Sequence, residues 1–87
     1  MPYISKERRP EIDKLVDALG WILEDMDATD GDVNYAITRL LVSLYPPVHY
    51  LPLERAIGLL ECVKLEFYRR RVVLYEDIKK EENGDVF

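Results

Sequence analysis

Apolar residues recur every three or four positions in three stretches of the chain, which is the spacing of one face of an α-helix. The stretches cover residues 10–27, 30–45 and 52–82. The pattern predicts an all-α fold with three helices in a bundle-like arrangement and little or no β-structure. A chain of 87 residues has room for one domain. We therefore expect residues 1–87 to form a single all-helical domain.

Residues that start and stop helices lie at the edges of these stretches. Pro10 suits a first helical turn because proline has no N–H group, which would be unpaired there anyway. Thr29 and Asp30 are favourable caps for the second helix. Pro46 and Pro47 end that helix, since proline cannot continue its hydrogen bonds. The third helix is expected to open with Pro52 in its first turn and to close at Asn83 and Gly84.

The third stretch is long for a small domain. A helix over residues 52–82 would measure roughly 45 Å at about 1.5 Å per residue, whereas a compact domain of this size is about 30 Å across. Two outcomes follow from this mismatch. Either the helix bends near residues 71–74, where the β-branched Val72 and Val73 weaken it, or its end packs on a second chain.

Charge and cysteine content narrow the environment in which the protein works. The formal net charge is −5 at pH 7, so its field repels phosphate groups and makes a nucleic-acid partner unlikely. No apolar run is long enough to span a bilayer. The single Cys62 cannot form an internal disulfide, and no apolar leader precedes residue 10. We expect a cytoplasmic protein in which Cys62 packs between apolar neighbours.

Seven polar residues on the second and third helices are the candidates for a binding site. Asn34 is a poor residue for a helix interior, so it suggests a specific hydrogen bond. Three consecutive arginines at 69–71 are the only basic concentration in the chain and could hold a phosphate or carboxylate. We predict instead that these residues are held by structural pairs, such as Glu66 with Arg69 or Arg70. The candidate ligand-binding residues are Asn34, Thr38, Glu61, Glu66, Arg69, Arg70 and Tyr75.

Catalytic and metal chemistry have little support in the sequence. Glu61 and Glu66 are five residues apart, which places them about 140° apart around a helix, so they cannot easily share one ion. One histidine and one cysteine leave no nucleophile with an obvious base. We therefore predict no catalytic residue, no metal ligand and no cofactor, and we expect that Mg²⁺ or Mn²⁺ does not bind tightly.

Four sequence motifs resemble one family. They are MPYI at residues 1–4, GDVNYAIT at 31–38, AIGLLECVKLEFYRR at 56–70 and YEDIKKEENGDVF at 75–87. Together they resemble a family of small uncharacterised proteins of bacteria, archaea and phages, described as a domain of unknown function. The resemblance implies no activity. It also implies a proline in relatives at the position of Leu74, and hence a break before Tyr75 in those proteins.

Two hypotheses of function follow from these patterns. The first is a non-enzymatic helical interaction module that forms a homodimer through its third helix, which explains the length of that helix. The alternative is a metal-dependent nucleotide-phosphate hydrolase or a phosphate-binding protein that uses the arginines with Glu61 and Glu66. The aromatic Phe87 either packs onto the helices or is displayed to a partner, and packing is the commoner arrangement for an apolar group.

Overall fold

The computed structural model describes all 87 residues, and every regular element in it is helical. A short 3₁₀ turn, η1 (Lys6–Arg8), leads into α1 (Arg9–Asp25), which is followed by α2 (Asp30–Leu44). The rest of the chain forms α3 (Tyr50–Phe67), the π-helical turn η2 (Tyr68–Val72) and α4 (Val73–Asn83). The predicted all-α fold is confirmed, and the predicted helix ends agree with the structure to within two residues.

The helix ends follow the local chemistry that the sequence predicts. Pro10 lies in the first turn of α1. Thr29 caps α2 by accepting a hydrogen bond from the Asp32 backbone N–H at 3.2 Å, while the Asp32 carboxylate accepts one from the Thr29 N–H at 2.9 Å. This reciprocal pair is a capping box. Gly84 follows the last residue of α4 with φ of 94°, a conformation that glycine adopts without strain.

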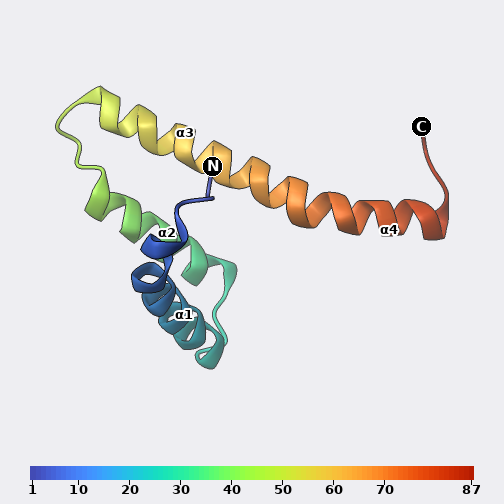
Figure 1. The fold of residues 1–87 in the computed structure, drawn as a ribbon, viewed down its shortest axis with the longest axis horizontal. Helices are drawn as coiled ribbons and strands as arrows, with labels where there is room; N and C mark the ends of the chain where they lie inside the picture. The colour runs from blue at the N-terminus through green and yellow to red at the C-terminus, as the bar shows by residue number, and fades with distance from the viewer.

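The third helical segment is continuous from α3 through η2 to α4 and contains 34 residues. At about 1.5 Å per residue it is about 50 Å long, which matches the longest dimension of the chain, 50 Å. Of the two outcomes left open by the sequence, folding back of the helix is wrong: α4 extends beyond the other helices (Figure 1). A π-helical turn, η2, spans Tyr68–Val72 and overlaps the range 71–74 in which the bend was expected, but the helix continues through it.

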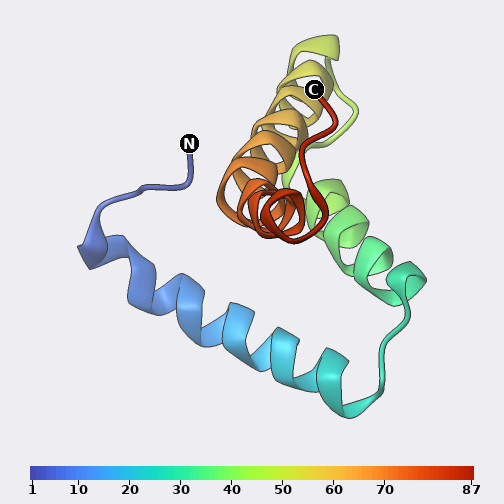
Figure 2. The ribbon, with the colours of Figure 1, turned by 90° about the vertical axis from the view of Figure 1, so that its right-hand side faces the viewer.

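The three helical segments are spread apart in the single chain. Figure 1 shows α1 and α2 on one side of the long helix, near α3, while α4 extends away from them. Figure 2, turned by 90°, shows that α1 also stands apart from the long helix along much of its length. The radius of gyration is 16.7 Å, whereas a compact domain of this length has about 12 Å.

The apolar faces of the helices are therefore largely uncovered. Ala56 on α3 is the one buried residue. The accessible surface is 8317 Å², compared with about 5,300 Å² for a compact monomer of the same mass. Phe87, which we expected to pack onto the helices, is fully exposed, so that prediction is wrong for the single chain. No helix combines the length and the apolar character needed to cross a membrane.

Candidate functional site

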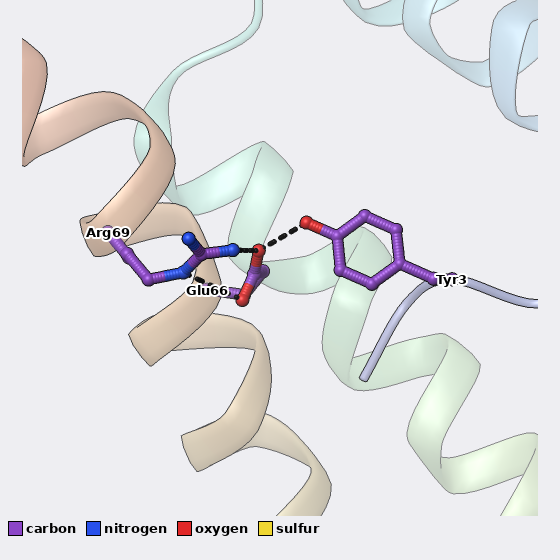
Figure 3. A network of polar contacts seen from close by, with 3 residues as sticks. All are labelled: Tyr3, Glu66 and Arg69. Carbon is purple, nitrogen blue, oxygen red and sulfur yellow. Dashed lines mark hydrogen bonds and ion pairs between the residues drawn. The ribbon is translucent and has the colours of Figure 1, made fainter.

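A three-residue polar cluster links the N-terminal segment to the middle of the long helix (Figure 3). Glu66, in the last turn of α3, accepts a hydrogen bond from the Tyr3 hydroxyl at 2.5 Å. Its carboxylate also accepts from Arg69, which lies one turn later in η2, with the Nη2 to Oε1 distance at 2.6 Å. The predicted pair of Glu66 with Arg69 is confirmed, and it is a structural contact within one helix.

The electrostatics of the cluster favour the charged forms of Glu66 and Arg69. The hydrogen bond from Arg69 is the main cause that holds the pKa of Glu66 below its usual value, and the bond from Tyr3 adds to the effect. The same pair raises the pKa of Arg69, chiefly through the hydrogen bond to Glu66. In the folded chain, Glu66 therefore keeps its negative charge down to a lower pH than an ordinary glutamate does.

The N-terminal segment is held by a second set of bonds. Arg9 donates from Nε and Nη2 to the carbonyl oxygen of Ile4, at 3.1 and 2.9 Å. Together with Tyr3 on Glu66, these bonds fix residues 1–5, the N-terminal strap, between α1 and the end of α3. Tyr3 was not among the predicted site residues. The only sequence signal for it was its place in the MPYI motif, which carries no spacing relation to Glu66.

A groove of about 400 Å³ lies between the N-terminal strap and the long helix. Its apolar wall comes from α3 and its basic end from η2. Cys62 is exposed in this groove, so the prediction that it packs between apolar neighbours is wrong for the single chain, because nothing covers that face of α3. The lining residues are Met1, Pro2, Tyr3, Leu59, Cys62, Val63, Glu66, Phe67, Arg70 and Arg71.

The predicted residues of α2 lie in a different place. The Thr38 hydroxyl donates to the Asn34 side-chain oxygen at 3.0 Å, one turn back on the same helix. Both residues line an open hollow beside Asp30, Gly31 and Tyr35 at the start of α2. No hydrogen bond connects them to the third helix. The predicted residues of the second helix are thus not joined to those of the third helix within one chain.

The remaining candidates on the long helix serve separate local contacts. Glu61 forms an exposed ion pair with Lys64 at 3.0 Å. Tyr75 carries Lys79 over its ring, with the ammonium 5.7 Å from the ring centre. Arg70 lines the groove and forms no ion pair. Of the seven predicted residues, the structure joins Glu66 to Arg69 and Asn34 to Thr38, and it does not gather the seven into one site.

The side chains that could bind a metal ion are not gathered in one place. No group of three or more histidine, cysteine, aspartate or glutamate side chains is placed to hold one metal ion. The carboxylate of Glu66 is already occupied by Arg69 and Tyr3. What the arrangement offers is a short apolar groove with cationic side chains at one end.

A comparison with known families gives a match over nearly the whole chain. A family model described as "Domain of unknown function (DUF6899)" matches residues 1–86, and the chain belongs to this family. The resemblance to a family of unknown function seen in the sequence motifs is confirmed at that level. No curated protein and no solved structure matches the chain.

Proposed function

We propose that this member of the DUF6899 family is a non-enzymatic helical interaction module that works as a homodimer, with the third helix as its main contact. The observation that carries the proposal is the uncovered surface. The chain exposes 8317 Å², about 3,000 Å² more than a compact protein of its mass. Burial of that excess in a dimer would remove about 6,000 Å² in total, which falls in the range of obligate dimers.

The end of the long helix contributes strongly to this surface. Leu74 is 61% exposed, and Tyr75 and Ile78 are each 57% exposed. At about 100° per residue these three side chains share one face of α4. Burial of each such side chain is worth about 1.5–3 kcal/mol. A two-fold pair is the commonest assembly of small proteins, and it would cover this face in both chains at once.

The same proposal includes the setting in which the dimer works. A lone Cys62 per chain suits a reducing compartment, because no disulfide within the chain is needed or available. We therefore place the dimer in the cytoplasm, with residues 1–87 acting as one domain. Its physiological role would be to present an assembled helical surface to other molecules.

The test is the mass in solution, measured by light scattering at micromolar concentration. We expect about 20 kDa, twice the 10.2 kDa of one chain. The double variant Leu74→Glu/Ile78→Glu should give about half that mass, because it places two carboxylates on the apolar face of α4.

The matched control is Lys80→Glu, which changes the net charge by the same amount on the opposite, solvent-facing side of α4. This variant should remain a dimer. A wild-type protein that is monomeric at every concentration, with a mass that neither variant alters, would refute the proposal.

A further inference from the structure

The contacts within a single chain do not explain the stability of its helices. An unfolded chain of this mass exposes about 14,800 Å², and a 60-residue domain already buries about 60% of such a surface on folding. This chain, with 8317 Å² still exposed, buries only about 44% by the same relation. Helices of about 15 residues are marginal in water without tertiary contacts. The folded helices therefore need cover that their own chain does not supply.

The lengths of the uncovered elements match each other. The segment formed by η2 and α4, which extends beyond the other helices in Figure 1, covers residues 68–83 and is about 24 Å long. Helix α1 covers residues 9–25 and is about 25 Å long. Its apolar residues Leu15, Val16 and Ile22 are 71%, 58% and 51% exposed. One uncovered helix of this chain can thus cover the other along its full length.

The charges of α1 and of the turn η2 are complementary, whereas α4 itself carries four carboxylates against two lysines. Helix α1 carries five carboxylates and two basic side chains. One of these two, Arg9, donates its hydrogen bonds to the Ile4 carbonyl oxygen. The turn η2 carries Arg69, Arg70 and Arg71, of which only Arg69 forms an ion pair. The arginines without a carboxylate partner therefore lie on the element whose length matches the acidic helix. The five carboxylates belong to Glu11, Asp13, Asp17, Glu24 and Asp25.

From these observations we infer that α1 of one copy packs along η2 and α4 of a second copy, and the reverse, so that the core forms between chains and the isolated chain has no stable fold. This inference rests on the proposed homodimer and goes further, because it names the two elements that meet and couples folding to association. The occupant of the uncovered face of α4 is the acidic helix α1 of the same protein.

A mixing experiment tests the pairing of α1 with η2. One variant carries Glu11→Lys and Asp25→Lys, which reverse two charges beside Leu15 and Ile22 at the edge of the apolar face of α1. The other carries Arg70→Glu and Arg71→Glu. Each alone should give about half the wild-type mass at a concentration where the wild-type protein is a dimer, because like charges meet at both contacts.

An equimolar mixture of the two variants should recover the mass of the dimer. Residues 11 and 25 lie about 21 Å apart along α1, so in the mixed dimer, whichever way α1 runs, one of the two new lysines meets the new glutamates of the other chain. The second contact keeps the natural charges. Asp17→Lys is the control, since Asp17 lies on the side of α1 opposite the apolar face, and this variant should remain a dimer. Variants that are dimeric alone, or a mixture that stays monomeric while the wild-type protein is a dimer, would overturn the pairing and leave the homodimer standing.

Thermal melting of the wild-type protein tests the coupling of folding to association without any substitution. If the two are one event, the melting temperature should fall by about 3–6 °C for each tenfold dilution. A dimer whose melting temperature is the same at all concentrations would overturn the coupling. A protein that is monomeric and stably folded at all concentrations would refute the homodimer itself, which separates the two failures.

Discussion

The start of α2 and the whole of α4 are both regular helix, yet different kinds of interaction stabilise them. At the start of α2, Thr29 and Asp32 satisfy each other's backbone and side-chain groups within three residues of the sequence. In α4, the backbone is equally regular, but Leu74 and Ile78 have no apolar partner from elsewhere in the chain and are 61% and 57% exposed.

This difference separates local from tertiary stabilisation. A capping box contributes the same free energy whether or not the chain has a partner, because all its groups are neighbours in sequence. The apolar face of α4 contributes only when another surface covers it. Variants in the two regions should therefore respond differently to protein concentration.

The largest effect is expected from Ile78→Ala in α4. If a second chain covers Ile78, loss of its side chain should reduce the free energy of unfolding by about 2–5 kcal/mol per site. If Ile78 stays in water, the same change should stabilise the helix slightly, because alanine is the best helix former. Chemical denaturation followed by circular dichroism gives the sign directly.

Lys80→Ala is the matched control for this change, since Lys80 is exposed on the opposite side of the same helix. It should alter the free energy of unfolding by no more than about 0.5 kcal/mol. Equal effects of the two alanine variants would show that α4 has no covered face and would remove the contrast between the two regions.

A smaller effect is expected at the start of α2. Thr29→Ala removes the side-chain acceptor for the Asp32 N–H and should cost about 1 kcal/mol, while Thr29→Ser keeps the acceptor and should cost much less. The cost should be the same at low and high protein concentration when each is referred to the wild-type protein at that concentration. A cost that grows on dilution would contradict the local character of the cap.

The smallest effect is expected at Glu66, as a change in acid sensitivity. The pKa of Glu66 is lower in the folded chain than its ordinary value of 4.5. Its contribution to stability is therefore complete above that ordinary value and is lost as the pH falls through the lower folded pKa. Melting temperatures measured down to about pH 3 should fall less steeply for Glu66→Gln than for the wild-type protein.

Tyr3→Phe removes one of the two donors to Glu66 and should give an intermediate slope in the same measurement. Identical slopes for all three proteins would mean that the cluster of Tyr3, Glu66 and Arg69 contributes nothing to the folded state. Tyr3→Phe removes only the hydroxyl and Glu66→Gln removes only the carboxylate charge, because phenylalanine and glutamine preserve the shapes of the side chains they replace.

Most of the secondary structure could be predicted because its signals are local. The caps at Thr29 and Gly84 and the prolines at positions 10 and 52 act through neighbours in sequence, so the helix ends agree closely with the structure. The π-helical form of η2 could not be predicted in the same way. The β-branched Val72 and Val73 indicated a weak point in the helix, but no residue in this turn specifies a wider hydrogen-bonding pattern.

The candidate site was predictable only where its contacts lie within one helix. Glu66 with Arg69 and Asn34 with Thr38 are three and four residues apart, so helix geometry alone brings them together. Tyr3 was missed because 63 residues separate it from Glu66. Cys62 and Phe87 were expected to be covered, since apolar groups usually are, and a single chain in this open form offers them no cover.

The wide turn η2 also changes the direction in which the long helix presents its side chains. In an uninterrupted α-helix, Leu74 and Ile78 would continue the line of Leu60 and Phe67. A π turn accommodates one additional residue, so every side chain after it is rotated by about 100° around the axis. Phe67 lines the groove beside the N-terminal strap, whereas Leu74 and Ile78 do not. Deletion of one residue from Tyr68–Val72 should bring Leu74 and Ile78 back into line with Phe67.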